Sequence, residues 1–530
     1  MIEEALIKFG LTNATADARS GMRISNGKLS RFSDRSIAVR LFITCWLVFA
    51  LHFATNTVRE IYPALSLGDH LTFDVSEYSG LHPDIFEIQG RGAFINNNPG
   101  ASILGAVPYA LFRPITDRII ERVQASRAQN PQLEQVQYAT IYPMAQEFYR
   151  TAREKGLDVK FGLAAGITQV LVMAPISALG ATIMFWIFLS LTDDRRMSVV
   201  LALLYAFATP VIFRTAQLNQ NMLVANFALF AFVLLWRPWD KEKSSKPYYF
   251  LAGLCAGWTV VLDYSGIVAV VALSGYAFWK WSSCPKSERN FSDLVKYGAG
   301  VSICAAILMA YQWLAFGNPI LPPQSYMPPA NFTDFGYRGF SFPQLDLLFD
   351  TAFGIRYGLF TSAPILLAAL AAPFILRKRD FLLANAETTF IVVFTGLFFI
   401  FCSANQYGRM QFNSGVRHIV PVVPFLFIFA AIVLMKIPRT FAIVFGALGL
   451  YWSWCLAMYR DVEQGLGVFE SIRHITFGGP QLPWLSTLER MGFASGISPV
   501  LILLFVVILI LIFWSVGARR QLPSSAINVE

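Results

Sequence analysis

Apolar stretches alternate with polar ones along the whole chain, and about twelve of them are near the length of a membrane-spanning helix. A helix needs about 20 apolar residues to cross the hydrocarbon core of a bilayer, because it advances only about 1.5 Å per residue. The pattern therefore predicts an all-α integral membrane protein with about twelve transmembrane helices. The segments lie at 38–56, 163–191, 196–214, 220–237, 248–263, 265–281, 296–316, 357–376, 386–402, 418–435, 439–458 and 497–515.

The polar stretch that follows the first segment is much longer than a simple connection requires. Within it, residues 114–123 combine a helical apolar pattern with Arg113, Arg118 and Arg122. This pattern favours a helix lying in the membrane interface, although a soluble helix packed on the loop's own core would look similar. We expect this first loop to be extracytoplasmic and to hold the functional site. A shorter loop of the same side is expected at 403–417.

Composition supports burial in lipid and argues against nucleic acid as a partner. Of the residues, 55% are hydrophobic and only 14% are charged, whereas soluble proteins carry about 25% charged residues. The net charge of +9 is spread over short basic runs between apolar segments, a distribution that marks cytoplasmic loops. We therefore predict a lipid-bilayer partner and no nucleic-acid partner. The runs lie at 195–196, 241–246, 377–379, 436–439 and 519–520.

The segments 248–263 and 265–281 could form one long helix instead of two. The polar sequence Asp263-Tyr264-Ser265-Gly266 between them favours a break. Without that break, the basic run 377–379 would lie outside the cytoplasm, against the usual bias of basic loops. The predicted parts are then a cytoplasmic segment (1–37), the first transmembrane helix (38–56), the large loop (57–162), a helix bundle (163–458) with a second loop (317–356), a third loop (459–496), the last transmembrane helix (497–515) and a cytoplasmic tail (516–530).

Glu60 lies about one helical turn beyond the apolar end of the first segment. A carboxylate at this depth would be partly desolvated, which raises its pKa. Such a group suits a general base that takes a proton from a sugar hydroxyl. The plainer interpretation is a solvated acid at the membrane surface that is paired with Arg59.

Further polar residues follow in the same loop. Asp74, His82 and Asp84 are candidates for acid–base chemistry or for binding a substrate. His82 and Asp84 are a weak metal pattern, because no second pair completes a ligand set, so we name no metal site and leave a divalent metal open. Asn97 and Asn98 precede Pro99-Gly100, where they can cap a helix or help its N-terminus bind an anion.

Several arginines lie where the later loops meet apolar segments. These are Arg356 beside Tyr357, Arg409, and Arg417 beside His418. Arginine forms bidentate hydrogen bonds with phosphate, so these side chains could hold a lipid-linked phosphate. Anchoring at lipid headgroups is an equally ordinary role for arginine at this depth.

The order of these pieces resembles the GT-C superfamily of membrane glycosyltransferases, in its dolichyl-phosphate-mannose-transferase-like branch. The resemblance covers about residues 38–435. The chain departs from many relatives in two places: Asn56 and Glu60 occupy the region of the usual catalytic Asp, and Asn98 replaces the usual Lys of the Pro-Gly motif. The motifs that carry the resemblance are Phe94-Ile95-Asn96-Asn97-Asn98-Pro99-Gly100, Gly317-Asn318-Pro319, Arg356-Tyr357-Gly358-Leu359-Phe360 with Ser362-Ala363-Pro364, and Gly415-Val416-Arg417-His418-Ile419 with Pro421 and Pro424.

The resemblance implies inverting transfer of a sugar from a polyprenyl-phosphate donor to a glycan, lipid or protein acceptor. It implies a bacterial inner (plasma) membrane location, with the active site on the periplasmic or extracytoplasmic face. Glu60 inherits the role of catalytic base, and Asp74 and Asp84 are second choices. The implied substrate-binding residues are Arg59, His82, Asn97, Asn98, Arg356, Tyr357, Arg409, Arg417 and His418.

Two other classes share the predicted architecture. A transporter would also have about twelve helices, but it should show inverted repeats and broken polar helices at mid-membrane, and the sequence contains no repeat. A ligase or polymerase of lipid-linked glycans would share an arginine-rich outer site but usually carries its large loop late in the chain. The early loop favours the transferase.

Overall fold

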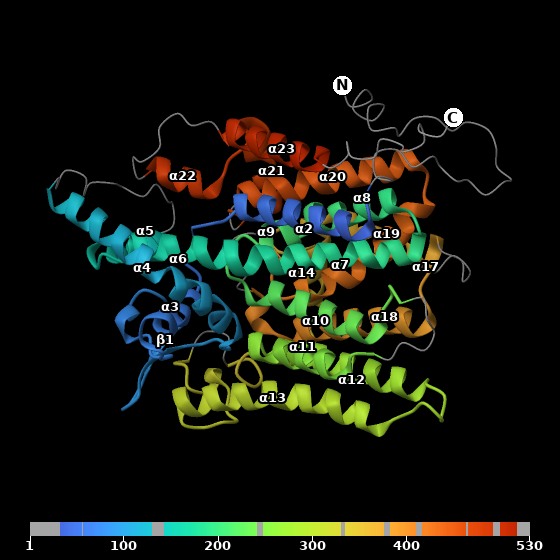
Figure 1. The fold of residues 1–530 in the computed structure, drawn as a ribbon. Coiled ribbons are helices and arrows are strands. Elements are labelled where there is room, and N and C mark those ends of the chain that lie inside the picture. Colours follow the sequence, from blue (N-terminus) through green and yellow to red (C-terminus); the bar gives the residue numbers. More distant parts are fainter. Residues whose placement is uncertain are drawn as a thin grey trace, which may run out of the picture.

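The computed structural model describes residues 32–55, 57–129, 143–240, 247–329, 334–375, 382–409, 416–462, 465–490 and 499–516. These residues are mostly helical, and the helices of the bundle run roughly parallel (Figure 1). The elements of the first loop gather at one end of that bundle, on the left in Figure 1. Asn56, Gly415 and the basic runs 241–246, 377–379 and 519–520 lie outside the described residues.

The bundle is built from long apolar helices around a continuous buried core. α6 and α7 form one helix through a π-helical turn at Gln169–Met173, the kind of irregularity that bends a helix without ending it. The helices are α2 (Asp34–Leu51), α6 (Asp158–Thr168), α7 (Ala174–Thr192), α8 (Arg195–Phe207), α10 (Gln220–Trp236), α11 (Tyr249–Leu262), α12 (Gly266–Ser282), α13 (Phe291–Phe316), α18 (Asn385–Ala404), α19 (Val423–Lys436), α20 (Arg439–Met458) and α23 (Pro499–Ser515).

Four helices of the described residues are long and apolar enough to cross a membrane. They are the continuous helix Asp158–Thr192 together with α13, α18 and α20. Shorter apolar helices, α10, α11, α19 and α23 among them, accompany these four. The structure thus agrees with an all-α membrane protein in its helix content and in these four helices.

Two predicted helices are interrupted in the structure. The segment 357–376 is not one helix, because Pro364 and Pro373 cannot continue helical hydrogen bonding; it forms α15 (Leu359–Ser362), η6 (Pro364–Leu366), α16 (Leu367–Leu370) and α17 (Ala372–Ile375). The segment 196–214 ends as a helix at Phe207 and resumes after Pro210 as the short α9 (Val211–Arg214). The remaining short elements are η5 (Pro323–Ser325), α14 (Leu345–Phe353), η8 (Gln406–Arg409), η9 (Val420–Val422), α21 (Val468–Gly478) and α22 (Pro483–Arg490).

The predicted break at Asp263 is confirmed. α11 ends at Leu262, Asp263 is extended, and α12 begins at Gly266. The two helices lie close at this turn: a Cβ on Gly266 would meet the carbonyl oxygen of Thr259 at 2.1 Å. Only glycine permits this approach, so the turn returns the chain directly along the bundle.

The first loop folds as a compact unit. It contains α3 (Ile61–His70), η2 (Ser76–Tyr78), the antiparallel strands β1 (Ile85–Ile88) and β2 (Gly92–Ile95), α4 (Gly100–Gln129) and α5 (Pro143–Glu154). Residues 114–123, predicted as a separate helix, belong to the continuous α4, which also contains Pro108 and Pro114. Buried Asp69 on α3 pairs with Arg113 at 3.2 Å and with Lys160 at 2.9 Å, which ties α3 to α4 and α6.

Two hydrogen bonds link this unit to the bundle, and a third lies within the unit. The Asn98 amide donates to the carbonyl oxygen of Val260 at 2.6 Å, and the Tyr311 hydroxyl donates to that of Asn97 at 3.2 Å. The Ser102 hydroxyl on α4 donates to the carbonyl oxygen of Glu60 at 2.8 Å. These bonds fix the residues around Glu60 against the ends of α11 and α13.

Candidate functional site

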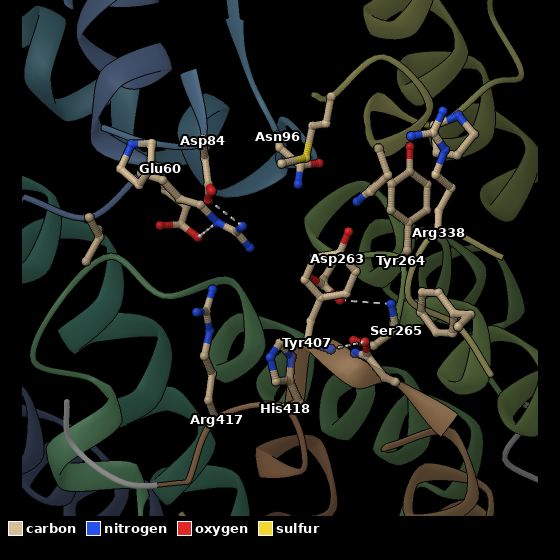
Figure 2. A pocket seen from close by; sticks show the side chains of 18 of the residues that line it. Glu60, Asp84, Asn96, Asp263, Tyr264, Ser265, Arg338, Tyr407, Arg417 and His418 are labelled. Atoms are coloured by element: carbon tan, nitrogen blue, oxygen red, sulfur yellow. Dashed lines mark hydrogen bonds and ion pairs between the residues drawn. The ribbon is translucent and has the colours of Figure 1, made fainter. Parts of the chain in front are cut away.

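A cavity of about 660 Å³ lies where the first loop meets the bundle, and we call it the loop-side cavity. Ionisable side chains from several elements face it, as Figure 2 shows for Glu60, Asp84, Asp263, Arg417 and His418. Its size suits a ligand larger than a single sugar. The lining residues are Thr57, Val58, Arg59, Glu60, His82, Pro83, Asp84, Asn96, Arg214, Gln217, Asn219, Asp263, Tyr264, Ser265, Ile320, Pro322, Gln324, Ser325, Met327, Pro328, Pro329, Tyr337, Arg338, Phe340, Phe401, Asn405, Tyr407, Arg417 and His418.

Glu60 is buried, with 3% of its surface exposed, and its carboxylate lines the cavity. It occupies the N-cap position of α3, but its side chain does not cap the helix. Instead Oε1 lies 3.4 Å from Nε of Arg59. The same guanidinium lies 3.2 Å from Oδ2 of Asp84 through Nη1, so one arginine holds two carboxylates together (Figure 2).

The charges around Arg59 determine its own pKa and that of His82. Burial lowers the pKa of Arg59, but the carboxylates of Glu60, Asp84 and Asp263 outweigh burial and raise it above its ordinary value. Burial also lowers the pKa of His82, and Arg59 adds to that effect while Asp84 opposes it. The imidazole is therefore neutral at pH 7. Its Nδ1 accepts from the backbone N–H of Asp84 at 3.0 Å, which leaves the proton on Nε2.

Two further arginines form the other charged wall. Arg417 is half-buried, and its Nε donates to Oδ1 of Asn221 at 3.4 Å. Arg214 on α9 is only 2% exposed, and its Nε is buried without a hydrogen-bond partner among the described residues. No carboxylate of those residues forms an ion pair with it. Burial lowers the pKa of Arg417, and Arg59 lowers it further.

An uncompensated buried arginine is costly for the protein by itself, because a buried charge needs a partner. Arg214 faces a cavity that Arg417 also lines. An anion in this cavity would supply the missing partner for Arg214 and would lie beside the second guanidinium group, that of Arg417. The arrangement therefore favours an anionic ligand, and phosphate matches the bidentate geometry of arginine well.

Asp263 contributes a third carboxylate from the turn between α11 and α12. Its Oδ1 accepts from the backbone N–H of Ser265 at 2.8 Å, and its Oδ2 accepts from the side-chain amide of Gln220. Both partners are neutral. Among the described residues, no cation pairs directly with Asp263, in contrast to Glu60 and Asp84.

The opposite wall of the cavity is largely apolar, although Arg338 also lines it. Gly317 ends α13 in a left-handed conformation, with φ of 75°, and Asn318 accepts hydrogen bonds from the backbone N–H groups of Ile320 and Leu321. This turn sends the chain across the mouth of the cavity. The apolar residues that line it are Ile320, Pro322, Met327, Pro328, Pro329, Phe340 and Phe401. An amphipathic anion fits such a cavity better than a fully polar one does.

Half of the residues predicted for the site meet at this cavity. Glu60 and Asp84 are there from the proposed acids, and His82 stands beside them. Two predicted arginines and one predicted histidine also line it, which are Arg59, Arg417 and His418. These six come from the first loop and from the segment before η9.

The other predicted residues do not line the cavity, and most have structural partners. Asp74 accepts from the backbone N–H groups of Ser76 and Ala93 through Oδ1, which ties η2 to β2. Asn97 and Asn98 are buried beneath the cavity against α13 and α11. The first of the Asn residues, Asn96, lines the cavity in their place.

Two predicted phosphate ligands also lie elsewhere. Arg409 pairs with Asp346 at 2.6 Å and donates to Gln344 at 2.9 Å, so it fastens α14 to η8. Arg356 is exposed, and Tyr357 beside it is buried outside the cavity. Of the arginines proposed to hold phosphate, only Arg417 therefore faces the cavity.

Sequence reasoning missed Arg214 and Asp263 as site residues. Arg214 fell at the end of a predicted transmembrane helix, and Asp263 was used only to separate two helices. A signal existed for each: an arginine at the non-cytoplasmic end of a predicted span, after a helix-breaking Pro210, and an acid within a polar break. Ionisable residues at such depth usually have a function. Arg338 and Tyr407 carried no comparable signal.

No group of three or more His, Cys, Asp and Glu side chains in the described part of the chain could hold a metal ion. Comparison with protein-family models, with curated proteins and with solved structures finds no match for this chain. The functional argument therefore rests on the cavity itself: carboxylates that can take a proton, the buried Arg214 without a carboxylate partner among the described residues, and a largely apolar wall.

Proposed function

We propose that this chain is a membrane glycosyltransferase that transfers a sugar from a polyprenyl-phosphate donor to an acceptor hydroxyl. The observation that carries the proposal is Arg214. It is a buried arginine without a carboxylate partner among the described residues, and it shares a cavity with Arg417, Glu60 and an apolar wall. A donor of this kind combines the two properties that the cavity favours, an anionic phosphate and an apolar chain.

The walls suggest how the donor would lie. The phosphate would bind between Arg214 and Arg417, which would relieve the buried positive charge of Arg214. The isoprenoid chain would leave along the apolar wall near Phe340 and Phe401. The sugar would then face Glu60, Asp84 and Asp263, whose oxygens can accept hydrogen bonds from its hydroxyl groups.

The transfer itself is a single displacement with inversion. The acceptor oxygen forms a bond to the anomeric carbon while the bond from that carbon to the phosphate oxygen breaks. The acceptor proton passes to the Glu60 carboxylate, and the bonding electrons leave with the lipid phosphate. Arg214 and Arg417 stabilise the negative charge that develops on the leaving group. Asp84 and Asp263 are the alternative bases, since each lines the same cavity.

We infer a GT-C-like arrangement of about twelve membrane crossings, with this cavity on the extracytoplasmic side of a bacterial inner membrane. Two basic runs in the described residues support the orientation. Arg195-Arg196 lies at the start of α8, and the chain reaches Arg214 in the cavity only after the other end of this helix. The run 436–439 joins α19 to α20 and does not line the cavity. Basic runs at these ends agree with a cytoplasmic location.

The alternatives make different predictions for the same cavity. A transporter binds its substrate near the membrane midplane, whereas this cavity lies at the ends of α10, α11 and α12, which favours the transferase. A ligase or polymerase of lipid-linked glycans would use the same arginines. It would consume a donor carrying a glycan chain rather than a single sugar.

The test is donor consumption by the purified full-length protein in lipid nanodiscs. A panel of polyprenyl-phosphate sugars is offered with and without simple glycoside acceptors, and lipid phosphate and glycosylated product are measured. We expect release of lipid phosphate from at least one donor. Arg214→Gln should weaken donor binding roughly tenfold to a hundredfold, since it removes a charged hydrogen-bond donor, while Arg356→Gln should leave it unchanged.

Three results would count against the proposal. Release of no lipid phosphate from any donor would remove the transferase activity. Equal donor affinity in Arg214→Gln and wild type would remove the phosphate site. Uptake of an intact donor into vesicles without cleavage would favour the transporter instead.

A further inference from the structure

A second cavity, of about 310 Å³, lies at the other end of the bundle, and we call it the distal cavity. α10 connects the two: Asn219 before its first turn lines the loop-side cavity, and Trp236 at its last residue lines the distal one. A 17-residue helix is about 25 Å long. The distal cavity is therefore a separate site, and its interpretation does not depend on the proposed transferase activity.

A buried carboxylate lines this cavity. Glu387, in the first turn of α18, is only 2% exposed. Its Oε1 accepts from the Tyr276 hydroxyl at 2.6 Å and from Nζ of Lys280 at 3.4 Å. No hydrogen bond from the described residues reaches Oε2. One carboxylate oxygen is thus left for a ligand.

A second polar group in the cavity also lacks a partner. Tyr249, the first residue of α11, is 4% exposed and lines the cavity. Its hydroxyl is buried without a hydrogen-bond partner among the described residues. Buried hydroxyls are nearly always hydrogen-bonded, so this group indicates a ligand or solvent in the cavity. The indole rings of Trp236 and Trp281 line the same space.

The charge of the lining determines which ligand fits. Two cations, Lys280 and Arg289, stand against three carboxylates, Glu288, Asp293 and Glu387. Both cations are already engaged: Lys280 pairs with Glu387, and Arg289 donates to the carbonyl oxygens of Ser282 and Cys284. Asp293 also pairs with Lys296, outside the lining, at 3.4 Å, so an anion would meet carboxylates but no lining cation that is available to bind it. A positively charged ligand meets a carboxylate oxygen, a hydroxyl and two indole rings.

We propose that the distal cavity binds an organic ammonium group. Its N–H bonds would reach Oε2 of Glu387 and the hydroxyl oxygen of Tyr249, and Trp236 and Trp281 would enclose its carbon atoms. Carboxylates combined with aromatic rings are a general solution for ammonium recognition. Two sources share this chemistry: a small amine in solution, and the ethanolamine headgroup of a phospholipid. The residues that line the distal cavity lie at the ends of α10, α11, α12 and α18. This position at the end of the bundle places the cavity within reach of either source.

The experiment separates the two sources with the full-length protein. In the first arm, the protein is held in phosphatidylglycerol nanodiscs, and ethanolamine is titrated by calorimetry with ethylene glycol as the uncharged match. In the second arm, phosphatidylethanolamine replaces the phosphatidylglycerol of the nanodiscs, and the thermal unfolding of the protein in the two lipids is compared. Saturable ethanolamine binding identifies a soluble amine, and stabilisation only by phosphatidylethanolamine identifies the lipid headgroup. Either result supports the proposal.

Three variants test the residues. Glu387→Gln should weaken amine binding roughly tenfold or more, because it removes the charged acceptor. Tyr249→Phe should weaken it a few-fold, and it removes a hydroxyl that has no partner in the described structure, so folding is preserved. Tyr248→Phe, the adjacent exposed tyrosine outside the cavity, is the matched control. The proposal is overturned if neither arm detects binding, or if Glu387→Gln and Tyr249→Phe both bind as wild type does.

Discussion

Glu60 and Glu387 form similar ion pairs in two cavities whose other charged residues differ. Both carboxylates are buried, and each lies 3.4 Å from one cation, Arg59 or Lys280. In the loop-side cavity, four arginines stand against three carboxylates. In the distal cavity, two cations stand against three carboxylates. An isolated pair therefore does not reveal the ligand, because the remaining charges of the lining determine whether an anion or a cation completes the site.

The two pairs also differ in how their cations are shared. Arg59 divides its guanidinium between Glu60 and Asp84, so neither carboxylate has a full counter-charge. Lys280 pairs with one carboxylate, that of Glu387, which also accepts a hydrogen bond from the Tyr276 hydroxyl. We expect the Glu60 carboxylate to take part in proton transfer and the Glu387 carboxylate to serve as a fixed binding group. The predictions below test that contrast.

The largest difference should appear when each of the two glutamates is replaced by glutamine. Glu60→Gln should lower the transfer rate by about 10²–10⁴-fold while donor binding survives, because it removes only the proton acceptor. Glu387→Gln should leave the transfer rate near wild type. Single-turnover kinetics with a saturating donor would measure both. If the two variants lose activity equally, the cavities are coupled; if only Asp84→Asn or Asp263→Asn abolishes transfer, the base is that residue.

Removing the shared arginine should mainly affect stability. Arg59→Met leaves the buried Glu60 and the half-buried Asp84 without their cation, which should destabilise the protein by about 2–3 kcal/mol, less than breaking a fully buried pair. Lys280→Met should cost less, since the Tyr276 hydroxyl still satisfies Glu387. Thermal unfolding in one detergent compares them. Adding Asp84→Asn to Arg59→Met should restore part of the loss, and a further loss would show that Arg59 does not hold these carboxylates.

The neutral His82 should make stability depend on pH. Burial lowers its pKa in the folded protein, so the unfolded chain takes up a proton first as the pH falls below about 6.5. Because the unfolded state then binds more protons, stability should decrease by up to about 1 kcal/mol per pH unit below that value. His82→Gln should flatten this slope, whereas Tyr249→Phe in the distal cavity should not. Unfolding temperatures between pH 7.5 and about 5 provide the comparison; parallel curves for His82→Gln and wild type would contradict it.

The smallest effects are expected at two arginines that the sequence suggested as phosphate ligands. Arg356→Ala and Arg409→Gln should leave donor affinity unchanged, because neither side chain lines the loop-side cavity. Loss of the half-exposed Arg409–Asp346 pair should cost less than about 1 kcal/mol. Arg417→Ala, tested beside them, should weaken donor binding. A weaker donor affinity in Arg356→Ala would mean that the cavity extends to that segment when the donor is bound.

Local patterns in the sequence were enough to predict the helices and part of the site. Apolar periodicity identified helical segments, and the polar residues after Leu262 identified the hairpin turn. Glu60 and Arg417 were recognisable because each lies at the edge of an apolar segment. The broken region 357–376 was not predicted, since a hydropathy average does not register the interruptions at Pro364 and Pro373.

The rest of the site depends on contacts between distant segments. Arg214, Asp263 and Arg338 approach the same cavity from three parts of the chain, and no local pattern specifies that meeting. Conversely, Arg409 resembles a site residue in sequence but finds Asp346 in space. An ionisable residue near a membrane edge is a reasonable candidate, and only its partners distinguish a ligand-binding group from a structural one.

The length of α12 has a consequence for the lipid around the protein. This helix spans 17 residues between a turn that lines one cavity and a segment that lines the other, and Ile267, Val271 and Phe278 are exposed along it. Its apolar height is about 25 Å, several ångströms less than the hydrocarbon core of a typical bilayer, which is about 30 Å. If α12 crosses the membrane, as the proposed twelve-helix arrangement requires, the bilayer beside this face has to thin to match it. Lipids with shorter acyl chains should therefore stabilise the protein, and thick, sterol-rich bilayers should strain it.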